Sequence, residues 1–242
     1  MNWTLLVHQI RTLLRPGRLV GLLLLAVVPA VILLIVGLTE GAEAGFVAEA
    51  AGGIGSTTFP IAALILAAAT LRDERDGGTL PYIYLKPISR ASLASTSILA
   101  AVAATGLLGV VAALTLTGAA AAVGAGIGEA AASVPLYLAA SVGYSALFVP
   151  LGYLLPRVVL TGLAYVILWE QVVARLVPGV ANTSIWRFAL SIYADLVHAA
   201  EELAEGLGPM AAGVWGGVAK IAAVALLGTG LLTWALRRRD AV

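Results

Sequence analysis

The chain has 242 residues, 61% of them hydrophobic and 11% charged, with a formal net charge of +1. An average soluble domain is about one quarter charged, so this composition predicts a membrane protein and argues against nucleic-acid binding, which needs a basic surface. The absence of cysteine excludes disulfides, thiolate metal sites and cysteine nucleophiles, and the two histidines, His8 and His198, lie too far apart to suggest a metal or haem centre.

Residues 1–17 are predicted to form an amphipathic helix at the membrane interface, ended by Pro16 and Gly17. Gln9, Arg11 and Arg15 fall outside its apolar stripe. A frayed segment before an uncleaved signal anchor is the less favoured alternative. The stripe recurs at helical spacing and consists of Trp3, Leu6, Ile10, Leu13 and Leu14.

Six stretches approach the roughly 20 apolar residues that a helix needs to cross a bilayer. Pro29 and Pro60 fall inside two of them, where neighbouring helices can satisfy the freed carbonyl groups. The sequence therefore predicts an all-α polytopic membrane protein, with one six-helix domain over residues 1–242. The stretches are approximately residues 19–38, 54–71, 93–116, 134–155, 158–177 and 212–236.

Basic residues gather in one set of connecting segments. All except Arg175, Arg187 and Lys220 lie before the first stretch or after the second, fourth or sixth, whereas the other segments hold most of the acidic residues. Cytoplasmic loops carry an excess of lysine and arginine. This asymmetry predicts a multi-pass protein of the cell membrane with both termini in the cytoplasm.

The segment 72–90, between the second and third stretches, joins a charged run to an apolar patch. The run 72–76 places the end of the preceding helix in water, Gly77 and Gly78 break that helix, and Ser89 is positioned to cap the next one. Residues 80–85 are predicted to form a short helix that presents aromatic side chains as a docking surface. Anchoring of these tyrosines among lipid headgroups is the open alternative.

The strings ERDGGTL (residues 74–80) and YLKPISR (residues 84–90) resemble a loop of the type-2 ABC transporter permeases, the six-helix membrane subunits of ABC exporters. The resemblance implies that this loop is a coupling helix that inserts into a groove of the ATP-hydrolysing subunit. Pro81 departs from the family's helix-forming residue, which places the start of the helix later. The residues assigned to the contact are Glu74, Arg75, Gly78, Thr79, Leu80, Tyr82, Ile83, Tyr84, Leu85 and Lys86.

The resemblance implies a transport subunit, not an enzyme, with no catalytic, cofactor or metal residues of its own. A phosphate-binding loop needs G-x-x-x-x-G-K-[ST], and neither Lys86 nor Lys220 follows a glycine. ATP and Mg²⁺ are expected on two copies of a partner ATPase subunit. A second permease subunit is also expected, with a homodimer favoured over a heterodimer.

Glu170 lies about two thirds of the way along the fifth stretch, within the apolar slab. A carboxylate there is costly and usually faces a bundle interior or a water-filled cavity, so Glu170, with Arg175 nearby, is a candidate intramembrane site. The structural alternative has equal weight: a buried acid bonded to Gln171, to Arg175, or to a serine or tyrosine of another span. Lys220 is a further candidate partner, unless it extends outward to water.

The external segment 182–207 is predicted to be amphipathic, lying on or dipping into the outer leaflet. It is either a cap over a transport pathway or a connector resting on the membrane. Its apolar stripe comprises Ile185, Phe188, Ile192, Leu196, Ala199 and Leu203, and its polar stripe comprises Arg187, Ser191, Asp195, His198, Glu202 and Glu205.

Two other function classes are less well supported. An intramembrane serine protease, suggested by GIGS at residues 53–56, lacks a histidine base within any predicted span. A secondary transporter, or another polytopic membrane protein that uses Glu170 as an intramembrane site, is the main alternative to the permease. The sequence shows no matching pair of Gly/Pro-broken half-spans, which would favour a secondary transporter.

Overall fold

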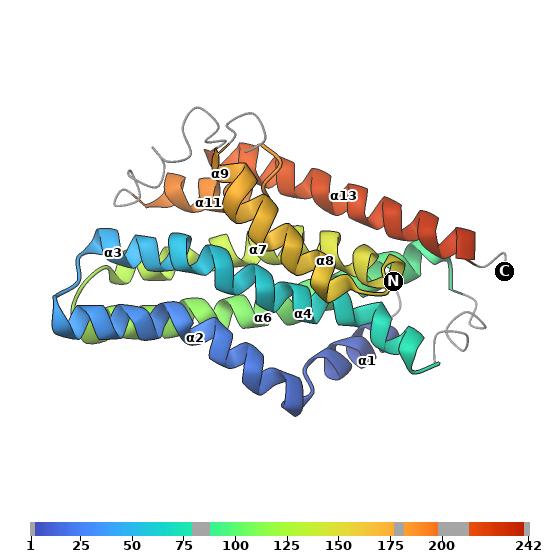
Figure 1. Ribbon diagram of the computed structural model, residues 1–242, viewed down its shortest axis with the longest axis horizontal. Coiled ribbons are helices and arrows are strands. Elements are labelled where there is room, and N and C mark those ends of the chain that lie inside the picture. Colours follow the sequence, from blue (N-terminus) through green and yellow to red (C-terminus); the bar gives the residue numbers. More distant parts are fainter. Residues whose placement is uncertain (1–2, 79–87, 177–181, 198–212, 240–242) are drawn as a thin grey trace.

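The computed structural model describes residues 3–78, 88–176, 182–197 and 213–239, with only the backbone at positions 175 and 239. Within these ranges every regular element is helical. The long helices lie roughly side by side in an elongated bundle (Figure 1). They are α2 (Pro16–Thr39), α4 (Gly55–Asp76), α6 (Arg90–Val123), α7 (Ile127–Leu154) and α13 (Gly213–Arg239).

Five helical stretches in the described part of the chain are long and apolar enough to cross a membrane. Four are α2, α6, α7 and α13. The fifth joins α3 (Ala44–Glu49), the π-helical turn η1 (Ala50–Ile54) and α4 without a break. These helices confirm the prediction of an all-α polytopic membrane protein.

The predicted span 158–177 forms a shorter unit. It comprises α8 (Val158–Ala164), the π-helical segment η2 (Tyr165–Val173) and α9 (Ala174–Leu176). Its apolar part, Val158–Val173, is shorter than the other five candidates. Five spans are therefore supported, and a sixth crossing stays a prediction.

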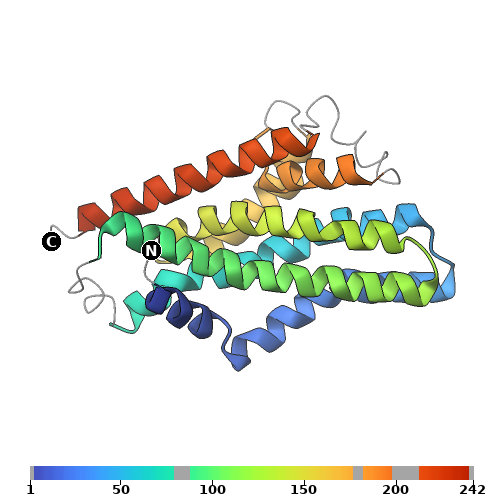
Figure 2. The same cartoon turned by 180° about the vertical axis from the view of Figure 1, so that it is seen from behind.

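The bundle has two chemically different ends. α1 (Trp3–Leu13), the end of α4, the start of α6 and the end of α13 lie together, and the α2–α3 and α6–α7 connections lie at the opposite end (Figures 1 and 2). The end that holds α1 and the end of α13 is called the basic end below. It carries Arg11, Arg15, Arg18, Arg72, Arg75, Arg90, Arg157, Arg237 and Arg238, whereas the opposite end carries Glu40, Glu43, Glu49 and Glu129.

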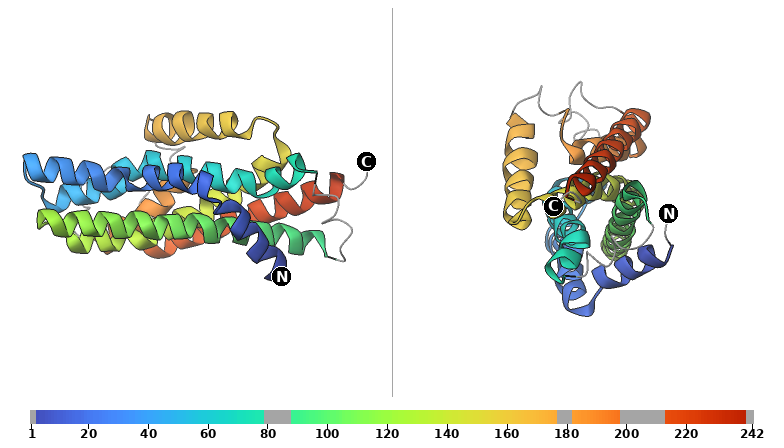
Figure 3. Two further views of the ribbon diagram at one scale, coloured as in Figure 1. Left: turned by 90° about the horizontal axis from the view of Figure 1, so that it is seen from below. Right: turned by 90° about the vertical axis from the view of Figure 1, so that its right-hand side faces the viewer.

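The buried face of α1 differs from the predicted stripe. Leu6 and Leu13 are buried as expected, but Trp3 is 69% exposed and Gln9 is only 1% exposed. Gln9 Nε2 donates a hydrogen bond to Ser97 Oγ of α6 at 3.1 Å. The placement of Gln9 on the polar face was wrong because a distant serine supplies the partner that a buried amide requires. A sharp bend before Pro16 separates α1 from α2 (Figure 3).

The external amphipathic segment also differs from its prediction. Its described part forms α11 (Ile185–Leu196), which packs between α7 and α13 instead of lying on the bundle surface (Figure 2). Ile185, Phe188 and Ile192 are buried as expected, but Ser191 is buried with them and Leu196 is exposed. The two-stripe assignment fails because α11 has neighbours on more than one side. Residues 198–207 lie outside the described part.

Candidate functional site

The two ends of the 72–90 segment form as predicted. α4 continues through the charged run to Asp76 and stops at Gly77 and Gly78. Gly78 has a φ of +68°, a backbone conformation that favours glycine. Ser89 Oγ accepts a hydrogen bond from the Ser92 backbone N–H at 3.2 Å and caps α6. Seven predicted contact residues lie outside the described residues, so the coupling helix itself stays a prediction: Thr79, Leu80, Tyr82, Ile83, Tyr84, Leu85 and Lys86.

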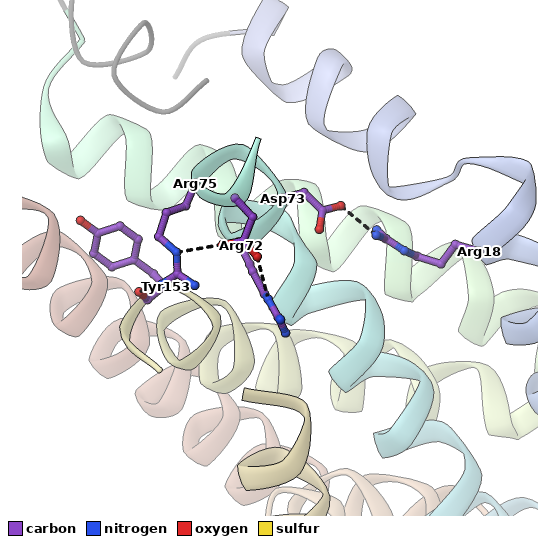
Figure 4. Close-up of polar contacts among 6 residues, drawn as sticks. Arg18, Arg72, Asp73, Arg75 and Tyr153 are labelled. Carbon is purple, nitrogen blue, oxygen red and sulfur yellow. Dashed lines mark hydrogen bonds and ion pairs between the residues drawn. The ribbon is translucent and has the colours of Figure 1, made fainter. Parts of the chain in front are cut away.

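The charged run ties the end of α4 to two other helices (Figure 4). Arg18 Nη2 of α2 donates to Asp73 Oδ2 at 2.8 Å, and Arg75 Nη1 donates to the Tyr153 carbonyl near the end of α7 at 3.0 Å. Asp76 accepts from Arg75 Nε at 3.3 Å. Partly exposed ion pairs contribute only about 0–1 kcal/mol each, so these contacts mainly set the position of the helix end.

Glu74 faces inward at the base of the loop. Its side chain is nearly buried, and Oε1 lies 3.4 Å from His8 Nε2 of α1. Glu74 therefore connects α4 to α1, as Arg75 connects it to α7. Of the predicted contact residues that the structure describes, these two brace the base of the loop against neighbouring helices.

Glu170 lies in η2 and is 5% exposed. Its Oε1 accepts hydrogen bonds from the Tyr165 hydroxyl at 2.8 Å, the Tyr144 hydroxyl at 3.2 Å and the Ile185 backbone N–H at 3.0 Å. Its Oε2 accepts from the Ser184 hydroxyl. Four donors from α7, η2 and the start of α11 thus surround the carboxylate. This agrees with the structural alternative, in which Glu170 is a buried acid bonded to a serine or tyrosine of another span.

The other proposed partners of Glu170 bind elsewhere. Gln171 Nε2 donates to the Ser56 carbonyl of α4 at 2.7 Å. Lys220 Nζ donates to Asn182 Oδ1 at 2.8 Å and lies 5.0 Å from the centre of the Phe188 ring. The Arg175 side chain lies outside the described residues, so its pairing with Glu170 stays untested.

The carboxylate of Glu170 stabilises the start of α11. An α-helix leaves its first N–H groups without intrahelical acceptors, and its dipole favours negative charge there. Glu170 accepts from the Ile185 N–H, and Ser184 Oγ accepts from the Arg187 N–H at 3.1 Å. The arrangement holds α11 against η2 and α7 deep in the bundle.

A second set of buried polar contacts lies at the π-helical turn η1. Trp186 Nε1 donates to the Gly52 carbonyl at 2.9 Å, and the Tyr137 hydroxyl donates to the Ala51 carbonyl at 3.4 Å. Buried tyrosine and tryptophan usually find such partners, which is the one sequence signal for these residues. The identity of the partner was not predictable, since Trp186 and Gly52 are 134 positions apart.

No metal-ligating group of three histidine, aspartate or glutamate side chains occurs among the described residues. Compared with models of known protein families and with curated proteins, the sequence matches none. A functional assignment therefore depends on the loop pattern and on the geometry above.

Proposed function

We propose that the chain is the membrane-spanning permease subunit of an ATP-driven ABC exporter, in which a separate ATPase subunit supplies the energy for substrate export. One observation carries the proposal. The segment that carries the 74–90 pattern connects α4 to α6 at the basic end, and the adjoining charged run contacts α1, α2 and α7.

These contacts suit a coupling role. Nucleotide-driven closure of two ATPase subunits moves whatever docks on them as a rigid body. A displacement at the loop passes directly to α4 and α6, and through His8, Arg18 and Tyr153 to α1, α2 and α7. The excess of arginine at this end supports a cytoplasmic location for the loop and for both termini. A second copy of the permease completes the transporter.

The geometry of Glu170 supports this proposal over a secondary transporter. A carboxylate that carries a coupling ion or proton must exchange its partners during transport. Glu170 accepts four hydrogen bonds from protein groups, three at Oε1 and one at Oε2. Those bonds suit a fixed structural role.

The proposal is tested by co-purification from native membranes. The wild-type chain is expected to bring down a protein that contains a phosphate-binding loop and hydrolyses ATP. Leu80→Asp or Tyr84→Asp should reduce its recovery at least about 30-fold, the effect of losing a contact worth 2 kcal/mol or more. Insertion of the variants into the membrane should be unchanged.

A matched control is Gly45→Asp, which adds the same charge in α3 at the opposite end of the bundle. Gly45 is exposed, and a Cβ there meets no atom within 4 Å. This variant should retain the ATPase. Recovery of the ATPase by both loop variants at the wild-type level would contradict the proposal, as would a wild-type preparation that contains no such protein.

A further inference from the structure

Helix α1 lies across the long axis of the bundle at the basic end. In the view along that axis α1 is seen along its length, while the long helices point toward the viewer (Figure 3). The bend before Pro16 joins α1 to α2, one of the helices long and apolar enough to span a membrane. A short helix in this position lies where the span leaves the hydrocarbon, at the level of the lipid headgroups.

The inner side of α1 is occupied by the bundle. Leu5, Leu6, Gln9 and Leu13 are buried, and Gln9 is bonded to Ser97 of α6. Any further partner of this helix therefore meets its outer side.

The outer side carries two arginines without partners. Arg11 and Arg15, four positions apart, are both exposed, and neither makes a hydrogen bond or an ion pair with another described residue. The carboxylates that contact this corner of the bundle are already engaged. Asp73 is bonded to Arg18 at 2.8 Å, and Glu74 lies 3.4 Å from His8. The described part of the chain thus leaves two accessible guanidinium groups without a counter-charge.

An apolar flank lies beside these arginines. His8, which contacts the end of α4, lies on the other flank of α1, so Arg11 stands between an apolar flank and a polar one. Apolar side chains that reach toward acyl chains, beside basic side chains that reach toward headgroups, are typical of a helix in the membrane interface. By helical position the apolar flank consists of Trp3, which is 69% exposed, and the partly exposed Val7, Ile10 and Leu14.

We propose that the outer side of α1 binds the headgroup of an anionic membrane phospholipid. The phosphate accepts hydrogen bonds from the guanidinium groups of Arg11 and Arg15, which match its oxygens in pairs, and the acyl chains lie along the apolar flank. The inference requires that the chain is embedded in a membrane with its basic end at the interface. It does not depend on the proposed permease function.

The unpaired charges select the class of lipid. A zwitterionic headgroup brings an ammonium group, for which the described part of this surface offers no free carboxylate. A soluble anion would leave the apolar flank uncovered. A lipid with a net negative charge satisfies both the arginines and the flank.

The test measures lipid binding to the full chain, purified in detergent and stripped of lipid, by native mass spectrometry. Dioleoyl phosphatidylglycerol is titrated against dioleoyl phosphatidylethanolamine, which has the same acyl chains. Glycerophosphoglycerol serves as an anionic headgroup without acyl chains. We expect the first phosphatidylglycerol to bind at least about tenfold more tightly than either of the other two probes.

Variants of the two arginines locate the site. Arg11→Gln and Arg15→Gln should each weaken phosphatidylglycerol binding about fivefold, the contribution of one basic residue at an anionic surface. Binding of phosphatidylethanolamine should be unchanged. Arg11→Lys keeps the charge and should bind phosphatidylglycerol within about twofold of the wild type. Both positions are exposed, so the variants should fold.

Arg238→Gln is the matched control. Arg238 is an exposed arginine at the same end of the bundle, but it belongs to α13 and its guanidinium lies 4.5 Å from the centre of the Trp234 ring. This variant should retain the wild-type affinity for phosphatidylglycerol.

Four results would overturn the proposal. The first is equal affinity of the wild type for the two lipids, and the second is wild-type affinity for phosphatidylglycerol when Arg11→Gln and Arg15→Gln are combined. The third is an equal loss in Arg238→Gln, which would indicate general attraction to the basic end. The fourth is equal competition by glycerophosphoglycerol, which would indicate a site for soluble anions.

Discussion

Glu170 shows how a single carboxylate is accommodated inside an apolar bundle. An ionised side chain in the hydrocarbon region is costly unless protein groups replace its hydration. Here two tyrosine hydroxyls, a serine hydroxyl and a backbone N–H do so. These donors come from three segments, and one of them is the backbone N–H of Ile185, the first residue of α11. The carboxylate therefore helps to position the start of α11 while its own hydrogen bonds are made.

We expect Glu170→Gln to destabilise the protein by about 1.5–3 kcal/mol, the usual range for hydrogen bonds to a charged group. The amide keeps the size of the side chain but replaces one accepting oxygen with an NH₂ donor, among neighbours that are themselves donors. Thermal unfolding in detergent measures the effect.

Glu43→Gln is the control for this substitution, because Glu43 is an exposed acid at the end of the bundle opposite the basic end. It should leave the unfolding midpoint unchanged. If Glu170→Gln instead melts like the wild type but abolishes the proposed export activity, Glu170 acts in that activity and the structural role is wrong.

At the scale of elements, glycine allows α13 and α7 to pack with their backbones in contact. A Cβ at Gly228 would collide with the Ala146 carbonyl of α7. Two residues further along α13, a Cβ at Gly230 would meet no atom within 4 Å. Membrane helices lack a hydrophobic driving force toward one another, so such close approach contributes much of their association.

We therefore expect Gly228→Ala to lower stability by about 1–3 kcal/mol, as overpacking typically does. Gly230→Ala should be neutral or stabilising by up to about 1 kcal/mol, since alanine favours the helix. The difference between their unfolding midpoints in detergent is the measurement. Equal midpoints would mean that α13 does not contact α7 at Gly228.

At the scale of the whole molecule, the arrangement predicts which segments share a side of the membrane. α1 and the end of α13 lie at the basic end, and the α2–α3 connection lies at the other (Figure 1). The absence of native cysteine allows each position to be labelled through one introduced thiol. The side reached by Arg238 reports whether the short unit α8–η2–α9 completes a sixth crossing.

Arg11→Cys and Arg238→Cys should react with a membrane-impermeant maleimide only after the cells are permeabilised. Glu43→Cys should react in intact cells. Labelling of Arg238→Cys from outside would limit the bundle to five crossings. Labelling of Arg11→Cys from outside would invert the orientation and place the 72–90 loop on the wrong side for an ATPase.

The sequence was sufficient to predict those features of the helices that depend on local chemistry. The helix stop at Gly77 and Gly78, the serine cap at Ser89 and the apolar length of the five long helices are all confirmed. Each depends on residues adjacent along the chain. The predicted faces of α1 and α11 were less successful, since Gln9 and Ser191 are buried. Periodicity assigns both residues to solvent, but Gln9 is bonded to Ser97 of another helix and Ser191 to the Phe188 carbonyl of its own helix.

Composition and local pattern alone establish a helical membrane protein with one basic and one acidic end, because crossing a bilayer depends on the length and polarity of a continuous run. The folded arrangement was needed to show what the buried polar groups bind. Glu170 is bonded to Ser184, 14 positions away, and Trp186 to Gly52, 134 positions away. A buried polar group must find a donor or acceptor wherever the packed helices place one, and that position is a property of the tertiary structure.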